Sequence, residues 1–331
     1  MSVKQYAAGV VGVGIMGSQH VRAYAEHPRV SLDAIVDLDE ETASEMADKY
    51  GGVDTYTDIG KAIDEQGLDM VSVATPESVH LPPTEAALAR DCHVLLEKPI
   101  SENIGDAQEI GRLVEESAAS LMLGYVCRFD PRYAGLRERI DAGEFGEILG
   151  VQAARIASAE MYDAVADWTN VLYYMAVHDI DMLQWYVGSD IEQVYATASA
   201  GLNGNETPAV VTATLRFETG TVGTLEANWS RPAGHPAGLT EEIRVSGTDA
   251  YGRLDIENDD AIVTTADGYE HVDTSSIHGA LVSNITREVD HFVTAVDNGT
   301  EPIVGWEDGL SSLAAANAIL TSIETGEPVN V

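Results

Sequence analysis

Residues 6–20 of the chain are Tyr6-Ala-Ala-Gly-Val-Val-Gly12-Val-Gly14-Ile15-Met16-Gly17-Ser-Gln-His20, an apolar run that enters a glycine-rich turn and continues as a helix-like segment. The spacing is G-x-G-x-x-G: Gly12 permits a tight turn, Gly14 lets a pyrophosphate approach the backbone, and Gly17 lets the helix pack against the strand. The first N–H groups of the helix, at Ile15 and Met16, attract a phosphate. The pattern predicts a dinucleotide site, against the alternative of a purely structural turn.

A carboxylate ends the next apolar run, Leu32-Asp-Ala-Ile-Val-Asp37. Asp37 lies twenty residues after Gly17, where a carboxylate accepts hydrogen bonds from the ribose hydroxyls of NAD and repels the 2′-phosphate of NADP. The sequence therefore predicts NAD as the cofactor, with NADP as the alternative.

Residues 5–124 alternate between apolar runs and helical patterns, which indicates a parallel sheet covered by helices on both faces. We expect strands at Ala7–Val13, Leu32–Asp37, Met70–Ala74, His93–Glu97 and Leu121–Gly124, with helices near 16–27, 40–49, 58–66, 80–90 and 103–118. Ligands of such sheets bind beyond the carboxyl ends of the strands. The predicted fold class is α/β, with an N-terminal Rossmann domain, a doubly wound parallel sheet, over residues 1–125.

The pattern changes after residue 126, where short strands follow one another with tight turns. The expected strands are Ile148–Ile156, Val194–Ser199, Ala209–Phe217, Val222–Asn228, Glu242–Ser246, Gly252–Ile256 and Ala261–Thr265; the expected helices lie near 132–142, 171–186, 281–298 and 307–324. These elements predict a second α/β domain, residues 126–331, with a large, mainly antiparallel sheet that has helices on one face. Its other face needs cover, which favours a homo-oligomer, a dimer or tetramer, formed through this sheet.

The formal net charge is −37, from 55 acidic and 18 basic residues. The acidic residues are spread through amphipathic segments, which is typical of a folded protein adapted to high salt and indicates a halophilic organism such as an archaeon. The absence of a basic stripe argues against nucleic acid and anionic membranes as partners. A small-molecule substrate is the expected partner.

Cys92 and Cys127 are the two cysteines, and they do not have metal-ligand spacing. No His, Asp and Glu cluster of ligand spacing is evident either, so no metal is expected. The sequence also lacks a run of eighteen apolar residues and a secretory signal, and a reducing, cytoplasmic location is the simplest expectation.

Lys98 lies in Glu97-Lys98-Pro99, at the end of an expected parallel strand. A lysine in this position beside a nucleotide site can donate a hydrogen bond to a substrate oxygen and stabilise a developing alkoxide. An ordinary solvated lysine is the alternative, but the position and the rarity of lysine in this chain favour a function. Pro99 would fix the turn, and a cis bond is one way to do so.

A second polar group lies in the expected helix 171–186. Tyr174 and His178 are four residues apart and His178 and Asp181 three, so all three share one face of an α-helix. His178 suits proton transfer near neutral pH, and Asp181 could orient it or bind a substrate hydroxyl. A structural polar cluster is the alternative.

In combination, these motifs resemble the glucose–fructose oxidoreductase and inositol dehydrogenase family, Gfo/Idh/MocA. The resemblance runs the whole length and rests on Gly12-Val-Gly14-Ile-Met-Gly17, Ala74-Thr75-Pro76-Glu-Ser-Val-His80, Glu97-Lys98-Pro99, Arg128-Phe-Asp-Pro131, Val177-His178-Asp-Ile-Asp181 and Trp306-Glu-Asp-Gly-Leu. It implies NAD(P)-dependent oxidation or reduction at a secondary alcohol of a sugar, cyclitol or sugar derivative. It also implies a catalytic Lys98 and His178 and a substrate contact at Asp181.

We assign further residues to the cofactor site because they end the parallel strands or lie in the motifs of the resemblance: Ala74, Thr75, Pro76, His80, Glu97 and Lys98. Substrate contacts are expected among loop residues, namely Arg128, Tyr162, Trp168 and Asn170, although packing explains each of them equally well. His20 and His27 are expected on the solvated side of the first helix.

One position departs from the family pattern, since many members have an aspartate where this chain has Tyr174. A phenol can hydrogen-bond His178 but supplies no negative charge at neutral pH. Either His178 transfers the proton and Tyr174 positions it, which we favour, or Tyr174 itself contacts the reacting oxygen.

Two other functions remain open at this point. One is a redox-assisted enzyme that uses tightly held NAD to cleave glycosidic bonds. The other is a non-catalytic protein that binds the cofactor for regulation.

The charge generates a first testable prediction. Because millimolar salt leaves the acidic surface unscreened, we expect the midpoint of thermal unfolding to fall when the protein is moved from molar to millimolar potassium chloride. Circular dichroism at both salt concentrations measures this midpoint, and an unchanged value would contradict adaptation to high salt.

Overall fold

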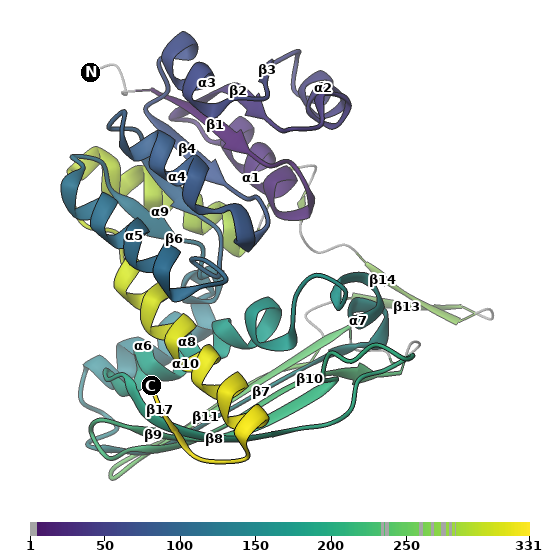
Figure 1. Cartoon of the computed structure of the whole chain (residues 1–331), viewed down its shortest axis with the longest axis vertical. Coiled ribbons are helices and arrows are strands. Elements are labelled where there is room, and N and C mark those ends of the chain that lie inside the picture. The colour runs from purple at the N-terminus through teal and green to yellow at the C-terminus, as the bar shows by residue number, and fades with distance from the viewer. Residues whose placement is uncertain are drawn as a thin grey trace. The chain divides into compact units, whose positions relative to one another are not determined.

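The computed structural model describes residues 5–232, 235, 238–257, 261–265, 268–272, 276–277, 280–281 and 283–331. The chain forms two compact units (Figure 1). The first consists of Met1–Phe129 with Ser275–Leu310, and the second of Asp130–Thr274 with Ser311–Val331. We predicted a single division at residue 125, whereas the chain passes back into the first unit at residues 275–310.

The first unit contains a six-stranded sheet in the order β3-β2-β1-β4-β5-β6, and every neighbouring pair is parallel. Its strands are β1 (Tyr6–Val11), β2 (Val30–Val36), β3 (Asp54–Tyr56), β4 (Met70–Val73), β5 (His93–Leu96) and β6 (Leu121–Leu123). This strand order is that of the dinucleotide-binding Rossmann fold, with a crevice where the order reverses between β1 and β4. The predicted Rossmann sheet is confirmed, although the short, largely exposed strand β3 was not predicted because it lacks an apolar run.

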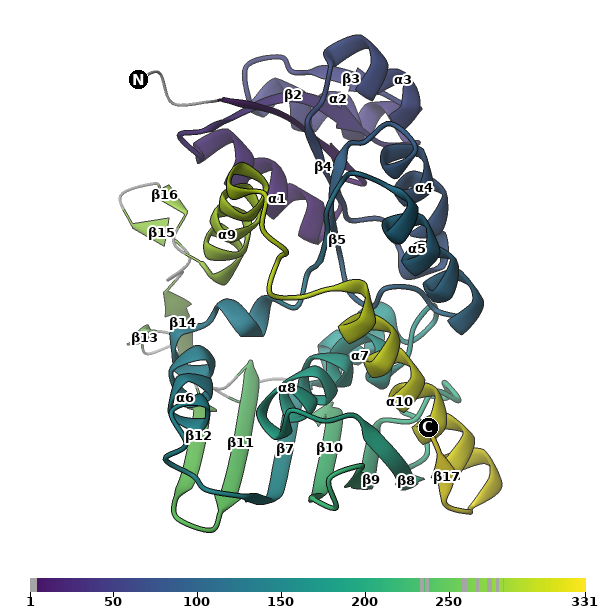
Figure 2. The same cartoon turned by 90° about the vertical axis from the view of Figure 1, so that its left-hand side faces the viewer.

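Helices cover both faces of this sheet. They are α1 (Ile15–Glu26), α2 (Glu40–Lys49), α3 (Ile59–Gln66), α4 (Leu81–Leu88), α5 (Ile104–Glu116) and α9 (Asn284–Asn298), with short 3-10 helices at Glu77–Val79 and Val126–Phe129. In Figure 2, α1 and α9 lie on one side of β4 and β5, and α4 and α5 lie on the other. All four residues of β4 are buried, as expected for a parallel strand covered on both faces.

The predicted solvated positions of His20 and His27 on α1 are wrong. His20 is fully buried, and the side chain of His27 is only 8% exposed and lies 3.3 Å from Asp290. The physical reason for His20 is that it faces the sheet, where it contacts Ser72 of β4 and Glu97. For His27 the reason is that α9, which comes from the far end of the chain, packs on α1 and supplies Asp290. The sequence of α1 alone gives no indication of this second covering helix.

The second unit contains a seven-stranded sheet in the order β12-β11-β7-β10-β9-β8-β17. Its strands are β7 (Ile148–Ser158), β8 (Ile191–Ala198), β9 (Val210–Phe217), β10 (Val222–Arg231), β11 (Leu239–Gly247), β12 (Tyr251–Glu257) and β17 (Val329–Asn330). Only β7 and β10 pair in parallel, so the predicted, mainly antiparallel sheet is confirmed. Two separate hairpins are formed by β13 (Ala261–Thr265) with β14 (Gly268–Val272) and by β15 (Ser276–Ile277) with β16 (Ala280–Leu281).

Helices lie on one face of the seven-stranded sheet in the second unit (Figure 2). They are α6 (Pro131–Asp141), α7 (Ala159–Val165), a π-helix at Leu172–Ala176, α8 (Val177–Val187) and most of α10 (Trp306–Thr325). In β9, Val211, Ala213 and Leu215 are buried and alternate with exposed Thr212 and Thr214, which is the pattern of a strand covered on one face. The segment 158–169 was predicted as a loop but contains α7.

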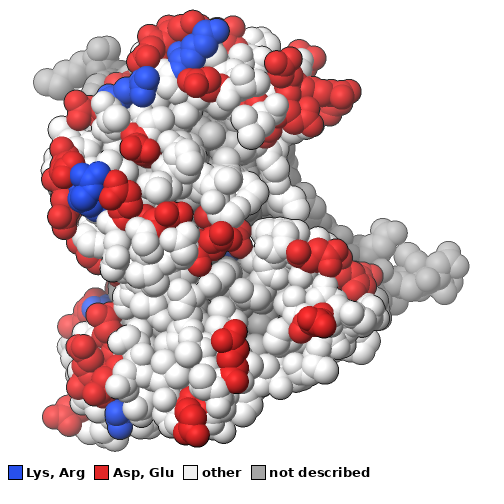
Figure 3. All heavy atoms as spheres, in the orientation of Figure 1, with Lys and Arg blue, Asp and Glu red and all other residues white. Residues whose placement is uncertain are grey.

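Two further features are the charge of the surface and the composition of the helices. Acidic side chains greatly outnumber lysine and arginine on the face shown in Figure 3. Among the described residues, no helix is both long and apolar enough to cross a membrane.

Two helix glycines in different environments provide a prediction on stability. A Cβ atom at Gly111, in α5, would lie 2.4 Å from Trp306 Cε3, whereas a Cβ at Gly135, in α6, meets nothing within 4 Å. We expect Gly111→Ala to lower the free energy of unfolding by about 1–3 kcal/mol through overpacking. We expect Gly135→Ala, the matched control, to raise it by about 0.5–1 kcal/mol. Denaturant titration measures both, and equal effects would contradict close packing at Gly111.

Candidate functional site

The turn between β1 and α1 is built by close contacts at two glycines. Gly12 has φ of +78°, and a Cβ there would lie 2.9 Å from the carbonyl oxygen of Ala74. A Cβ at Gly17 would lie 1.8 Å from the carbonyl oxygen of Gly12. The protein's own packing therefore requires glycine at both positions.

Gly14 differs from these two glycines. It precedes the first turn of α1, no side chain caps the helix there, and a Cβ would meet nothing within 4 Å. The free N–H groups at the start of α1 thus open onto space that a Cβ would partly fill. This arrangement fits the pyrophosphate of a dinucleotide.

Asp37 lies at the end of β2, beside the same turn. Its Oδ2 accepts a hydrogen bond from the backbone N–H of Val13 at 2.9 Å, and its Oδ1 accepts one from Asp39 at 3.0 Å. Each carboxylate oxygen can accept more than one hydrogen bond, so Asp37 can stabilise the turn and still bind ribose hydroxyls.

Exposed apolar side chains surround this turn. Ile15, Leu38 and Val79 are 79%, 88% and 46% exposed, and they follow β1, β2 and β4. The hydroxyl of Thr75, after β4, is buried and has no hydrogen-bond partner among the described residues. Apolar surface and an unsatisfied hydroxyl at the carboxyl ends of three adjacent strands both fit a bound dinucleotide.

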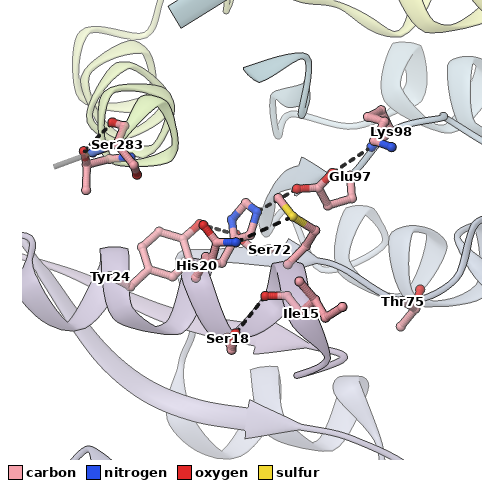
Figure 4. A network of polar contacts seen from close by, with 12 residues as sticks. Ile15, Ser18, His20, Tyr24, Ser72, Thr75, Glu97, Lys98 and Ser283 are labelled. Atoms are coloured by element: carbon pink, nitrogen blue, oxygen red, sulfur yellow. Dashed lines mark hydrogen bonds and ion pairs between the residues drawn. The ribbon is translucent and has the colours of Figure 1, made fainter. Parts of the chain in front are cut away.

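Glu97 and Lys98 follow β5, the next strand of the sheet. Glu97 is 6% exposed; its Oε1 lies 2.9 Å from His20 Nε2, and its Oε2 accepts the backbone N–H of Lys98 at 3.2 Å (Figure 4). The Lys98–Pro99 peptide bond is cis. Lys98 therefore lies on a turn that the carboxylate of Glu97 holds.

His80 lies under the same turn. It is buried, with Nε2 2.9 Å from the carbonyl oxygen of Thr75 and Nδ1 3.3 Å from that of Ile100. Burial lowers the pKa of His80, so the ring is neutral at physiological pH. The ring thus links the segment that carries Thr75 to the segment that carries Lys98. Ala74 and Pro76 are the sequence neighbours of Thr75. A direct contact between His80 and the cofactor stays a prediction.

Arg128 was predicted to contact the substrate, and the structure gives its guanidinium two partners in the first unit. Nη1 donates to the carbonyl oxygen of Ile303 at 2.9 Å, and Nη2 pairs with Asp308 at 2.8 Å. The side chain is 4% exposed. These contacts hold the segment that contains Ile303 and Asp308 against Arg128, within the first unit.

In the second unit, the helix that carries Tyr174 and His178 is not α-helical throughout. The structure has a π-helix over Leu172–Ala176, followed by α8 from Val177. The spacing argument for one shared face holds for His178 and Asp181, both in α8, but not across the wider π-turn that carries Tyr174. Such π-turns often occur at functional sites.

The three residues of this helix differ in burial. Asp181 is 1% exposed, whereas Tyr174 and His178 are only partly buried. Burial raises the pKa of Tyr174, so its phenol is neutral at physiological pH. This agrees with the expectation that Tyr174 supplies no negative charge.

Four aromatic rings, one of them that of Tyr174, form a row in the second unit. Buried Tyr162 packs edge-on against Trp229 with ring centroids 5.2 Å apart, Trp229 lies 6.3 Å from Tyr174, and Tyr174 lies 6.2 Å from Trp168. The Trp168 ring, at the end of the row, is 56% exposed. This exposed ring can pack on the apolar face of a ligand ring.

Tyr162 and Asn170, two other expected substrate contacts, have hydrogen bonds within the second unit. The hydroxyl of Tyr162 donates to the carbonyl oxygen of Thr207 at 2.8 Å. Asn170 Oδ1 accepts the N–H groups of Leu172 and Tyr173 at 2.9 and 3.1 Å, so it caps the π-helix.

Sequence reasoning missed an ion pair next to His178. Asp179, 1% exposed, binds both Nε and Nη2 of Arg155 in β7, at 2.9 and 3.0 Å. Arg155 also pairs with Glu241 in β11, which the hydroxyl of Tyr133 contacts. This network fixes α8, and thereby His178, to the sheet. Burial raises the pKa of Asp179, although the charge of Arg155 opposes the shift.

Other chemistry in the described part of the chain is limited. It contains no group of three or more His, Cys, Asp or Glu side chains that could hold a metal. Cys92 and Cys127 are both buried, and neither forms a disulfide.

Two family models match successive parts of the chain. Residues 6–125 match the family model GFO_IDH_MocA, described as an oxidoreductase family with an NAD-binding Rossmann fold, and residues 137–331 match the model of the C-terminal α/β domain. The myo-inositol 2-dehydrogenase of Thermotoga maritima is 28% identical over 340 residues, 98% of each chain. The inositol 2-dehydrogenase of Rhizobium meliloti is 26% identical over 332 residues, also 98% of each.

Among solved structures, the scyllo-inositol dehydrogenase of Lactobacillus casei with bound NAD(H) and scyllo-inositol has a TM-score of 0.87. It is 23% identical, and the match covers 99% of each chain. This likeness concerns the fold.

The turn generates a prediction that separates ligand binding from folding. Gly14→Ala should leave the free energy of unfolding nearly unchanged but raise the Kd for NAD about tenfold or more, because the new methyl group occupies the pyrophosphate space. Gly17→Ala should cost about 3 kcal/mol or more of stability. Titration of NAD by calorimetry and denaturant unfolding distinguish the two. Unchanged NAD affinity in Gly14→Ala would contradict this placement of the pyrophosphate.

Proposed function

Because this chain belongs to the Gfo/Idh/MocA family, and is thus an NAD-dependent oxidoreductase acting on CH–OH groups, we propose that its substrate is a cyclitol, sugar or sugar derivative. Relatives matched over nearly their full length are named inositol 2-dehydrogenases. The reaction would interconvert a secondary alcohol and a ketone. The same names do not favour a glycoside-cleaving enzyme or a non-catalytic regulatory protein.

The observation that carries the proposal is the position of Lys98 relative to the nucleotide turn. Lys98 follows β5, Thr75 follows the neighbouring strand β4, and the turn at Gly12 follows β1, which pairs with β4. A lysine in this row can place an ammonium group at the oxygen of a bound alcohol. The bound NAD supplies the hydride acceptor.

We propose that His178 accepts the hydroxyl proton while Lys98 stabilises the negative charge that develops on the oxygen. Tyr174 then acts as a positioning residue for His178. Its raised pKa supports this role over proton transfer, since a buried phenol is a poor base near neutral pH.

The cofactor preference rests on Asp37. Two backbone N–H groups hold its carboxylate beside the nucleotide turn, and its charge repels a 2′-phosphate. NAD should therefore be used more efficiently than NADP.

For the substrate, the exposed Trp168 ring gives the best-supported contact, because aromatic rings pack on the C–H faces of sugars and cyclitols. Asp181 is the proposed partner of a substrate hydroxyl. Contacts by Arg128, Tyr162 and Asn170 remain proposals, and each would have to share or replace the hydrogen bonds described above.

We also propose self-association through the outer face of the seven-stranded sheet. A shallow hollow of about 520 Å³ lies on this face across β7, β8, β9 and β10. Val222 and Tyr195, at 59% and 43% exposed, are among the residues that line it. Burial of such apolar groups favours a second copy of the chain as the cover.

The acidic surface supports the proposal of a protein from a halophile, where salt screens the repulsion among carboxylates. The two buried cysteines, which form no disulfide, support a reducing, cytoplasmic location.

The test is a screen of scyllo-inositol, myo-inositol, aldoses and nucleotide sugars with NAD and with NADP, in molar salt, following the absorbance of the reduced cofactor. We expect substrate-dependent reduction, with a higher kcat/KM for NAD than for NADP. An absence of reduction with every compound would contradict the proposed function.

Variants then test the roles. Lys98→Met and His178→Asn should lower kcat by about 10²–10⁴-fold, and Tyr174→Phe by less than about tenfold, as for one lost hydrogen bond. Tyr173→Phe is the matched control, because the Tyr173 hydroxyl binds Asn317 at 2.6 Å and should not affect kcat. If His178→Asn kept near-normal turnover while Tyr174→Phe abolished it, the two roles would be reversed.

A further inference from the structure

A chain of buried polar groups runs beneath the cofactor turn to Lys98. Tyr24 OH lies 2.9 Å from Ser72 Oγ, Ser72 Oγ lies 3.1 Å from His20 Nδ1, and His20 Nε2 lies 2.9 Å from Glu97 Oε1 (Figure 4). Glu97 Oε2 then accepts the backbone N–H of Lys98. His20 and Tyr24 belong to α1, the helix that begins at the pyrophosphate turn, so one network joins this helix to the lysine.

Glu97 is held in its charged form at the centre of this network. Burial by itself raises the pKa of Glu97, but the hydrogen bond and charge of His20 and the charge of Lys98 outweigh burial and lower it below the usual value. Gly124, directly after β6, leaves room for the carboxylate, since a Cβ there would lie 3.3 Å from Glu97 Oε2. The carboxylate thus has a fixed position and a fixed charge beside Lys98.

A second glutamate in this region has a different environment. Glu288 in α9 is fully buried, and neither carboxyl oxygen has a hydrogen-bond partner among the residues that the structure describes. Burial and the negative charge of Glu97 raise the pKa of Glu288 well above its usual value. Glu288 is therefore protonated when Glu97 is charged, and the two form an internal comparison.

We propose that Glu97 and His20 are positioning residues for Lys98, holding its ammonium group for the reacting oxygen and coupling it to helix α1. The effect on the reaction rests on the proposed function. The position and charge of Lys98 do not depend on it. Glu97 acts in two ways: Oε2 fixes the backbone of Lys98, and the negative charge attracts the ammonium. His20 keeps Glu97 in place, because it bonds Oε1 and leaves Oε2 to Lys98.

The first experiment measures the state of Lys98 without any substrate. Acetic anhydride acetylates free amines and not ammonium groups, and mass spectrometry quantifies acetylation at each lysine. In Glu97→Gln, we expect Lys98 to be acetylated about tenfold faster or more, because the amide lacks the charge that favours the ammonium form. Lys61, whose side chain is 63% exposed and pairs only loosely with Glu65 at 3.7 Å, is the internal reference and should keep its rate.

Glu288→Gln is the matched control. An amide replaces a protonated carboxyl group of nearly the same shape, so the acetylation rate of Lys98 and the turnover should stay at the wild-type values. An increase as large as that of Glu97→Gln would contradict the assignment to Glu97. His20→Gln changes the residue of α1 that contacts Glu97, and it should also increase the acetylation rate of Lys98, by a smaller factor. If circular dichroism shows that Glu97→Gln does not fold, the His20→Gln variant provides the test.

The second experiment separates positioning from binding. With scyllo-inositol or myo-inositol as substrate, Glu97→Gln should lower kcat by about 10–100-fold. This loss should exceed the change in the Kd for NAD, which calorimetry measures without substrate. Unchanged acetylation of Lys98 in the folded variants would overturn the proposal. Lack of wild-type turnover with either inositol would count against these substrates and not against the positioning of Lys98, which the acetylation rates decide.

Discussion

The close approach of helix α1 to the Gly12–Gly17 turn is the constraint on which the first unit depends. A Cβ atom at Gly17 would lie 1.8 Å from the Gly12 carbonyl oxygen, so the helix can start here only if position 17 has no side chain. This contact fixes the start of α1, whose first N–H groups we propose as the pyrophosphate site. It also fixes the direction of α1, and hence places His20 one turn further on, facing β4 and Glu97.

Buried charges in the two units are compensated in the same way. Glu97 has His20 and the Lys98 turn as partners, and Asp179 has two of the three nitrogens of the Arg155 guanidinium, Nε and Nη2. Removing one partner of such a buried pair generally costs about 3–5 kcal/mol, because the remaining charge lacks both water and a counter-charge. Each pair lies next to a proposed functional residue, Lys98 or His178. The stability of the fold and the position of these two side chains therefore depend on the same contacts.

The two units contribute different surfaces to the proposed reaction. In the first, backbone N–H groups and Asp37 form a polar site with exposed apolar side chains around it, which suits a cofactor of fixed structure. In the second, an aromatic row ends in the exposed ring of Trp168, and Tyr174 of the π-helix is part of this row. An aromatic wall recognises the shape of a ring rather than one particular hydroxyl. The substrate is thus less closely specified by the geometry than the cofactor.

Local patterns in the sequence were enough to predict the Rossmann sheet, the glycine turn, the strand-end position of Lys98 and the largely antiparallel second sheet. These features depend on periodicity, on glycine spacing and on the order of elements, all of which lie within short segments. The burial of His20 was not predictable in this way, because its partners Ser72 and Glu97 lie 52 and 77 residues further along the chain. The Arg155–Asp179 pair and the proximity of Glu288 to Glu97 likewise join distant segments, and the π-helix replaces an α-helical turn that the spacing favoured. Tertiary packing alone decides which polar side chains lose water and which partners they then meet, and that choice determines the charge of each group.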